Sequence, residues 1–393
     1  MTGVVFPGKV EFRNVEIPAV SFYQVTFTDH VWFSGSTFTS NATFEAATFI
    51  DGARFNETIF NGHAWFKETT FNGDASFEGT TFKRLAWFEE TTFNGDASFQ
   101  AATFIACARF DETIFKGHAR FDKTTFTRQA SFDETTFNGE AWFEETTFNG
   151  DVSFPSSGNT YGGEEVKAKV FPCANFQGAF FGGSVSFVNR RFLQPTVFRH
   201  CVFERAPEFH GCTLHQGTVF PPRQNFKDVT SEGAAQAYRT LKLAMEQTRS
   251  RQEEAMFFAL EQASHRAQKT TPWSIQILSF LYEKAANYGE SFLRPLGWLA
   301  MTTFIFIILY CVFSYDPTNK IWHLMESVQF AMEQLVRPFS AWLPNGGIAI
   351  KAILGNKSSA VLGLQILSTA QALVSLSLIT LFILAVRRRF RLG

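Results

Sequence analysis

The sequence has few of the features that build catalytic or metal sites. Its five cysteines form no CxxC pair, and no histidine cluster stands beside them at metal-ligand spacing. It contains no Walker loop, no nucleotide-binding glycine motif, no HExxH sequence and no serine or cysteine nucleophile in a recognisable setting. We therefore expect no enzyme, no catalytic residue, no bound metal and no cofactor, and we expect the cysteines to be reduced.

Two further absences bear on location. The first residues, MTGVVFPGKVEF, lack the uninterrupted apolar stretch of a signal peptide, so we expect the N-terminal part to stay in the cytoplasm. A strong net charge is also missing, since the formal charge is −1, but residues 1–154 hold 21 Asp and Glu against 11 Lys and Arg. Residues 155–393 hold 15 and 24. This asymmetry indicates an acidic N-terminal part and a basic region that lies near anionic lipid or another acidic partner. The alternative explanation is that the charges only form a solvated face.

Phenylalanine is the residue that the chain has in excess, with 49 Phe against 7 Tyr and 8 Trp. From Phe22 to Phe154 the phenylalanines follow one another in alternating steps of five and six residues. A small residue, typically Ala or Thr, stands two positions before each of them, and we expect both columns to point inward as a structural ladder. The ladder includes Phe44, Phe49, Phe55, Phe60, Phe66, Phe71, Phe77 and Phe82.

This spacing resembles the pentapeptide-repeat family, in which a small residue and a central Leu or Phe stack inside a right-handed quadrilateral β-helix. The chain departs from that family by inserting one residue in every second unit, which gives an eleven-residue double unit and coils of about 22 residues. We expect the glycine of pairs such as Gly73-Asp74 to widen one corner by adopting a positive φ. The predicted solenoid covers residues 1–154 and continues over 171–228, with an inserted loop at 155–170 that replaces one coil.

Residues 229–290 are predicted to form a helical connector. Apolar residues fall at helical spacing between Ser231 and Gln268, which indicates a helical hairpin, and Trp273–Tyr288 is typical of an interfacial helix. The run from Tyr238 through Lys242 to Tyr288, Arg294 and Tyr310 resembles the connector of pentapeptide-repeat proteins that end in an ion-channel-like domain of two helices. That resemblance implies a membrane domain at residues 291–393.

Two apolar runs, at about 296–314 and 361–386, are long enough to span a bilayer. The second ends in Arg387-Arg388-Arg389-Phe390-Arg391, and the positive-inside rule then places both termini in the cytoplasm. We expect a multi-pass protein of the inner, cytoplasmic membrane. Between the runs, a segment at about 321–345 is predicted to re-enter the bilayer, as in two-span channel subunits that assemble around a pore.

Six residues of this domain are candidates for lining such a pore. Polar side chains share one face of the second span, where they line a pore or only join packed helices by hydrogen bonds. The candidates are Gln365, Ser368, Gln371 and Ser375, with Glu333 and Arg337 in the segment before them. Because no Thr-x-Gly-Tyr-Gly sequence follows that segment, we do not expect potassium selectivity.

Three functions remain open from the sequence. The leading hypothesis is a homo-oligomeric, channel-like membrane protein whose cytoplasmic solenoid senses or binds a protein partner. The alternative is a membrane-tethered scaffold for protein interaction that does not conduct. The third is an acidic mimic of DNA, as some pentapeptide-repeat proteins are, although the apolar C-terminal third fits poorly with a soluble rod of that kind. Nucleic acid itself is not expected as a partner.

Overall fold

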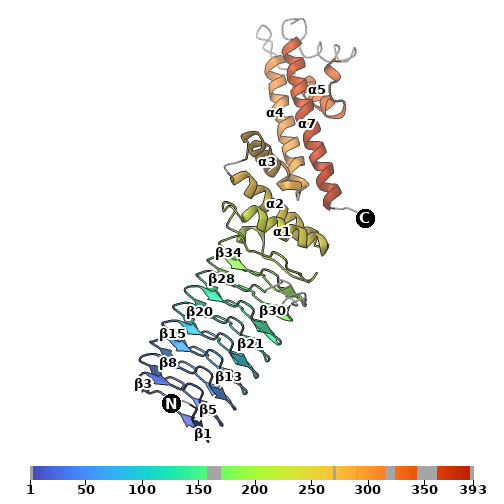
Figure 1. Ribbon diagram of the computed structural model, residues 1–393. Coiled ribbons are helices and arrows are strands. Elements are labelled where there is room, and N and C mark those ends of the chain that lie inside the picture. The colour runs from blue at the N-terminus through green and yellow to red at the C-terminus, as the bar shows by residue number, and fades with distance from the viewer. Residues whose placement is uncertain are drawn as a thin grey trace. The chain divides into compact units, whose positions relative to one another are not determined.

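The computed structural model describes residues 3–156, 170–268, 271–289, 291–314, 324–342 and 361–389. The chain divides into two compact units, Met1–Lys269 and Thr270–Gly393. The first is a parallel β-solenoid closed by two helices, and the second is helical (Figure 1). The predicted fold class is therefore confirmed.

The solenoid has four sides, each of which is a parallel sheet of two- or three-residue strands. Sheet A contains β1 (Val5–Phe6), β5 (Thr26–Phe27), β9 (Thr48–Phe49), β13 (Thr70–Phe71), β17 (Thr92–Phe93), β21 (Ile114–Phe115) and β25 (Thr136–Phe137). Sheet B contains β2 (Val10–Glu11), β6 (Val31–Trp32), β10 (Ala53–Arg54), β14 (Ala75–Ser76), β18 (Ala97–Ser98), β22 (Ala119–Arg120), β26 (Glu140–Trp142) and β30 (Cys173–Asn175).

Sheets C and D form the other two sides. Sheet C contains β3 (Glu16–Ile17), β7 (Thr37–Phe38), β11 (Ile59–Phe60), β15 (Thr81–Phe82), β19 (Thr103–Phe104), β23 (Thr125–Phe126), β27 (Thr147–Phe148), β31 (Phe180–Phe181) and β34 (Val202–Phe203). Sheet D contains β4 (Val20–Ser21), β8 (Ala42–Thr43), β12 (Ala64–Trp65), β16 (Ala86–Trp87), β20 (Ala108–Arg109), β24 (Ala130–Ser131), β28 (Val152–Ser153) and β32 (Val185–Ser186). A fifth pair, β29 (Val170–Phe171) with β33 (Arg191–Phe192), continues the coil beyond the insertion.

Each coil repeats the previous one at a fixed register, so like residues stack on like. Phe60 pairs with Phe82 in sheet C, and the rings of Phe44 and Phe66 lie parallel with centroids 4.8 Å apart. All eight phenylalanines of the predicted ladder are fully buried. Burial of each ring contributes about 1.5–3 kcal/mol, and repetition of that gain offsets the entropy lost in ordering so many turns.

Threonines of the small-residue column add a second, polar ladder inside the coil. Thr69 Oγ1 donates a hydrogen bond to Phe44 O at 2.7 Å, 25 residues earlier, and the other buried threonines of the column repeat the bond. The repeats occur at Thr58, Thr80, Thr91, Thr113, Thr124, Thr135 and Thr146. The hydroxyl is thus satisfied within the core, which explains why Thr alternates with Ala there.

The corner glycines have a different function from the one predicted. Gly73 does not adopt a positive φ; positive values occur at the opposite kind of corner, for example at Glu57 (φ 56) and Gly79 (φ 66). A Cβ on Gly73 would lie 2.7 Å from the carbonyl carbon of Asp51 on the adjacent coil. Glycine is therefore needed at this corner because two backbones approach closely, not because of its φ.

The insertion adds chain between two coils and does not replace one. We expected the inserted loop to replace one coil, but Phe176 stacks on Phe143 at 4.9 Å and Phe187 stacks on Phe154 at 5.0 Å, so no coil is missing. Across the insertion the register is 33 residues, as between Asp151 and Ser184, whereas it is 22 residues between most other coils, as between Asn72 and Asn94. The difference is the length of the inserted chain, and the stack continues across it. Residues 157–169 of the predicted loop lie outside the described residues.

Two helices, α1 (Ala234–Gln247) and α2 (Arg251–Ala267), follow a short 3₁₀ turn, η1 (Arg223–Asn225), and cover the last coil. Phe257 of α2 packs edge-on against Phe220 and Phe226 of that coil, at 5.1 and 5.5 Å. Tyr238 of α1 is fully buried and donates to Asp228 O at 2.6 Å. The predicted hairpin is thus a cap that closes the apolar end of the solenoid.

The described elements of the second unit are α3 (Trp273–Ala286), η2 (Asn287–Gly289), α4 (Leu293–Ser314), α5 (Leu324–Val336), η3 (Ser340–Trp342) and α7 (Val361–Arg389). Within α4 and α7, Leu293–Phe313 and Val361–Arg387 are long and apolar enough to cross a membrane. Only 17% and 28% of the apolar stretch of 18 residues in each is buried by the rest of the protein. The helix α3 exposes Trp273 and Leu278. The re-entrant prediction falls partly on residues 321–323 and 343–345, outside the described residues.

Candidate functional site

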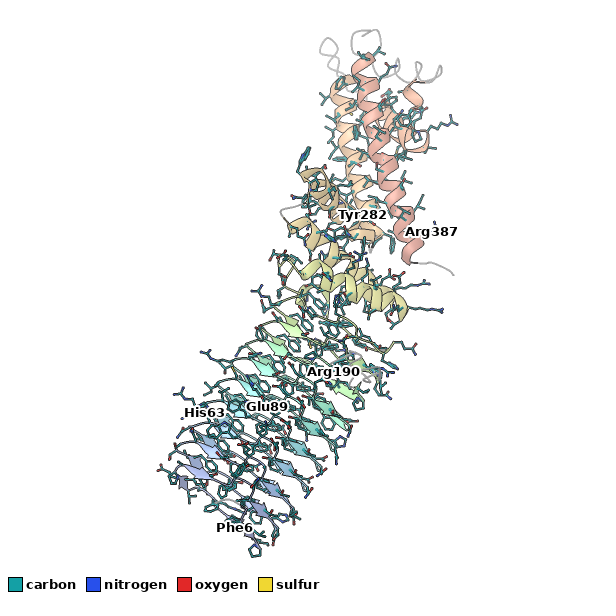
Figure 2. The ribbon with its side chains drawn as sticks, in the orientation of Figure 1. Phe6, His63, Glu89, Arg190, Tyr282 and Arg387 are labelled. Atoms are coloured by element: carbon teal, nitrogen blue, oxygen red, sulfur yellow. The ribbon has the colours of Figure 1, made fainter. Side chains whose placement is uncertain are left out.

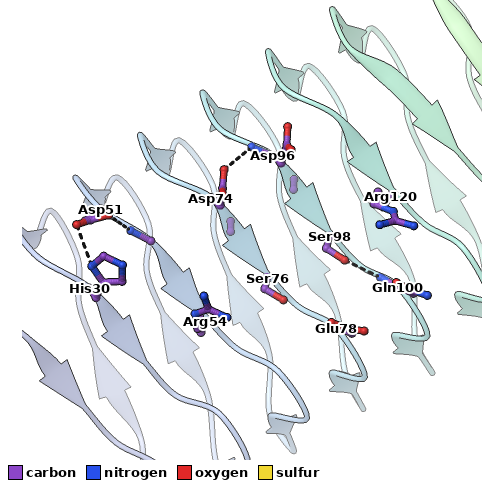
Figure 3. A pocket seen from close by; sticks show the side chains of 13 residues that line it. His30, Asp51, Arg54, Asp74, Ser76, Glu78, Asp96, Ser98, Gln100 and Arg120 are labelled. Atoms are coloured by element: carbon purple, nitrogen blue, oxygen red, sulfur yellow. Dashed lines mark hydrogen bonds and ion pairs between the residues drawn. The ribbon is translucent and has the colours of Figure 1, made fainter.

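The outer face of sheet B contains a hollow of about 410 Å³. The outward side chains of its successive strands run Trp32, Arg54, Ser76, Ser98, Arg120, Trp142, so two small residues lie between two arginines. Ser76 and Ser98 form the floor, and Arg54 and Arg120 stand at the ends (Figure 3). We call this site the serine hollow.

Acidic side chains form the walls of the serine hollow. Asp74 and Asp96 stand on one side and Glu78 on the other, with Gln100 beside it (Figure 3). Asp74 Oδ1 accepts the Asp96 N–H at 2.9 Å, and Asp96 Oδ1 accepts the His118 N–H at 2.8 Å. These bonds between successive coils hold the two carboxylates at fixed positions. They use only Oδ1 of each aspartate, so neither bond involves the second oxygen, Oδ2.

The hollow is open because a closing hydrogen bond present on sheet D has no counterpart among the described residues here. On sheet D, Ser131 Oγ donates to Asp111, and Ser153 Oγ donates to Asp133 Oδ1 at 2.6 Å. Burial raises the pKa of Asp111 in that network. The corresponding pair on sheet B is Ser98 with Glu78, and within the described chain the Glu78 carboxylate accepts a long bond of 3.5 Å from Asn56 instead.

The two ends of the serine hollow differ. Arg120 is held by Asp122, with Nε 3.3 Å from Oδ2, and lies over the Trp142 ring at 5.4 Å. Near Arg54, His30 Nδ1 pairs with Asp51 Oδ2 at 2.8 Å. Asp29, His30 and Asp51 place their ligand atoms within 4.8 Å of one another, but all three are partly or fully exposed and the histidine is already paired. We assign no metal to them.

The predicted pore residues of α7 face the other helices of their own unit. Ser368 and Gln371 are fully buried and Ser375 nearly so, whereas Gln365 is half-buried. The side chain of Gln371 joins three helices, because its Oε1 accepts Tyr310 OH of α4 at 2.7 Å and its Nε2 donates to Ala331 O of α5 at 2.9 Å. Ser368 Oγ donates to Gln365 O of its own helix at 2.8 Å.

The two charged candidates lie at the end of α5 and apart from this cluster. Glu333 is half-buried and Arg337 exposed, and the Arg337 N–H donates to Glu333 O at 2.7 Å. Their buried neighbour Gln334 donates to Ser340 Oγ at 2.7 Å. Sequence reasoning named six polar residues together, and the structure brings together the four of α7 without the charged pair.

Arg190 is a residue that the sequence reasoning missed. It occupies the small-residue column, two positions before Phe192, and is fully buried (Figure 2). Its Nε donates to Phe154 O. This bond is equivalent to those of the threonine column, but it joins residues 36 positions apart and not 25, because the inserted chain lies between them. Nη1 and Nη2 donate to Thr135 O at 2.6 Å and Phe132 O at 3.0 Å. Burial lowers the pKa of Arg190 to about 10, so the guanidinium stays charged at neutral pH.

Comparison with known proteins identifies the repeat. Residues 1–48, 33–81, 77–125 and 110–157 match the family model described as pentapeptide repeats (9 copies). No curated protein and no solved structure matches the chain. The stacked Phe ladder, the small-residue column and the four-sided coil agree with that match. The segment of residues 1–157 is therefore a run of pentapeptide repeats.

Proposed function

We propose that the chain is a membrane-tethered interaction scaffold, in which α4 and α7 anchor the protein and the solenoid binds a protein partner. The observation that carries the proposal is the bonding of Gln371 to both Tyr310 and Ala331 within one chain. A glutamine that joins three helices of one copy serves helix packing, and its polar groups are then not offered to a pore. The proposal assigns no catalytic activity and no cofactor.

The proposed location is the inner membrane, with both termini in the cytoplasm. Support comes from the length and composition of α4 and α7 and from the arginines that end α7, of which Arg387 is exposed (Figure 2). The outward aromatic and aliphatic side chains of α3 fit an interfacial position. The acidic solenoid would then remain on the cytoplasmic side, where it can meet soluble partners.

A homo-oligomeric channel is the second candidate, and one observation favours it. The helix α5 is short and amphipathic and packs against both long apolar helices, while Glu333 is only half-buried and Arg337 is exposed. In an oligomer those charges would line an entrance. The acidic DNA mimic has less support, because Asp74, Asp96 and Asp151 accept backbone N–H groups and arginines interrupt the acidic face.

Reconstitution of the full chain in planar bilayers under a KCl gradient separates the two candidates. The scaffold predicts a protein that resists carbonate extraction and carries no current, in wild type and in Gln371→Leu alike. A channel predicts discrete current events with a defined reversal potential, altered in Gln371→Leu and unchanged in the control Ser377→Leu, which lies on the exposed side of α7. Reproducible events of that kind would overturn the scaffold.

A further inference from the structure

We propose that the serine hollow binds an extended segment of the protein partner in which a cationic side chain lies between two carboxylates. This inference rests on the proposed scaffold function and names the chemistry of its partner. The walls of the hollow are negatively charged and its two ends are positively charged. It is therefore complementary to a segment with a positive charge in the middle and a negative charge on each side.

The centre of the hollow attracts a cation. Asp74, Asp96 and Glu78 surround the two serine hydroxyls, and the backbone bonds of the two aspartates fix their carboxylates in place. The volume of the hollow, about 410 Å³, is enough for a flexible side chain such as lysine. Ser76 and Ser98 leave room above the sheet and offer hydroxyl acceptors to an ammonium group.

The ends of the hollow attract carboxylates. Arg54 has no ion pair with any described residue, and Arg120 stays half exposed although Asp122 contacts it. A guanidinium recognises a carboxylate through two parallel N–H donors, which makes each end selective for Asp or Glu over a neutral side chain.

The spacing of these groups matches an extended peptide. Arg54 and Arg120 belong to β10 and β22, three strands apart in sheet B, which corresponds to about 14 Å at a strand spacing of about 4.8 Å. In an extended chain, side chains at positions i, i+2 and i+4 point the same way and the outer two are about 13 Å apart. A Glu-x-Lys-x-Glu segment along the solenoid axis therefore aligns its charges with the hollow.

The test uses a fluorescein-labelled peptide, Gly-Glu-Gly-Lys-Gly-Glu-Gly, titrated with the detergent-solubilised full chain and followed by anisotropy. The charge-reversed peptide, Gly-Lys-Gly-Glu-Gly-Lys-Gly, is the probe control. We expect saturable binding of the first peptide, at least about tenfold weaker binding of the second, and weakening of both as added salt screens the charges.

Two matched pairs of variants test the position. The double change Asp74→Asn and Asp96→Asn removes the wall charge but keeps the corner bonds, because Asn41 already accepts the His63 N–H in the same way at 2.9 Å. Its control is Asp151→Asn, since Asp151 accepts the Ser184 N–H on another corner. The change Ser98→Trp fills the hollow in a column that already carries Trp32 and Trp142, and Thr43→Trp, on sheet D, is its control.

We expect both hollow variants to weaken binding of the first peptide by about tenfold or more, and both controls to bind as wild type does. Absence of saturable binding by wild type, equal affinity for the two peptides, or an equal loss in a control and its partner variant would overturn the proposal. These results do not depend on bilayer current, so failure of the hollow and failure of the scaffold are distinguishable.

Discussion

At the scale of single residues, the core of the solenoid contains a buried arginine, and its guanidinium is surrounded by backbone carbonyl groups that accept its hydrogen bonds. Arg190 stands in the small-residue column about one coil after the insertion and binds three backbone oxygens. One of them, Phe132 O, is equivalent to Phe110 O of the preceding coil. Phe110 O accepts its hydrogen bond from Thr135 Oγ1, and Phe132 O accepts one from Arg190 instead. The arginine thus supplies donors across two coils.

Replacement of Arg190 by methionine should lower the free energy of unfolding of the solenoid by about 2–4 kcal/mol, because three buried carbonyls lose their donors. Thermal unfolding of the full chain in detergent, followed by circular dichroism, measures the change. Arg191→Met, at the neighbouring exposed position, is the control and should leave the transition in place. An Arg190→Met protein as stable as wild type would show that the carbonyls find other donors.

The sequence predicted the phenylalanine ladder but not Arg190. A ladder is visible because the same residue type returns at a fixed spacing, and only a buried stack requires that. Arg190 occurs once, and in a column where Ala and Thr are the rule it looks like an interruption. Its meaning depends on backbone oxygens of Phe132 and Thr135, far earlier in the chain, and these become neighbours only after the coil is built.

At the scale of elements, the two kinds of corner use the backbone differently. One kind places a residue such as Glu57 in the left-handed region, and the other brings the backbone of one coil against the next, so that a Cβ on Gly117 would lie 2.5 Å from Gly95 O. The sequence showed where glycines recur, but it did not show which constraint selected them. That distinction needs the distance between coils.

Gly117→Ala should therefore destabilise the solenoid by about 1–3 kcal/mol, because the coils must separate to admit the methyl group. Gly79 has a positive φ, but a Cβ there would meet its nearest atom at an ordinary 3.5 Å, and Ala101 adopts the same conformation at the equivalent corner. Gly79→Ala should cost about 1 kcal/mol or less. Chemical denaturation of the two variants side by side gives the comparison. If Gly79→Ala were the less stable variant, positive φ and not the close approach of two backbones would be the reason for glycine at the corners.

The junction between the last coil and α1 is organised by Asp228. Partial burial by itself raises the pKa of this carboxyl, but hydrogen bonds from Ser231, Thr230 and Ala206 outweigh it and the pKa falls below its ordinary value. A carboxyl whose pKa is lower in the folded state stabilises the fold at pH above its unfolded value. That contribution is lost as the pH falls through the folded pKa.

Asp228→Asn should accordingly be less stable than wild type at pH 7 and should lose less further stability as the pH falls from about 5 to about 2. Unfolding midpoints measured across this range test the difference. Glu11→Gln, whose carboxylate contacts Arg13 on the surface, serves as a control with a smaller effect at neutral pH. Parallel pH profiles for Asp228→Asn and wild type would mean that the carboxylate is not linked to folding.

The serine hollow also belongs to the scale of elements, because it exists only between strands. Ser76 and Ser98 look ordinary along the chain, and their significance appears when the outward residues of sheet B are read from one strand to the next. Sequence reasoning found the period of the coil but applied it to the inward columns alone. Whether the hollow is open also depends on the reach of Glu78 compared with Asp111, which spacing does not reveal.

At the scale of the whole molecule, the described residues form two separate hydrophobic cores. One contains the stacked phenylalanines and the capping helices, and the other is formed by Tyr310, Phe330, Ala331, Ala341 and Leu364 between the helices of the second unit. Since no described residue belongs to both, loss of packing in one unit should leave the other intact.

Phe99→Ala, in the middle of the solenoid, should cost about 3–5 kcal/mol and increase amide hydrogen exchange in the coils of the first unit. Exchange in α4 and α7 should not change. Mass spectrometry of peptides from each unit measures both, and Tyr310→Phe, which removes the hydroxyl that binds Gln371, should produce the opposite distribution. Increased exchange in both units of either variant would show that they unfold together.

Because most coils repeat at the same register, the length of the solenoid can change in evolution by gain or loss of whole coils. Most coils meet their neighbours through the same 22-residue pairings, so duplication or loss of the codons for one such coil leaves each ladder in phase. The structure shows that the ladder also survives a step of 33 residues. Reach can therefore change in increments of about 4.8 Å without any redesign of the core or of its helical cap.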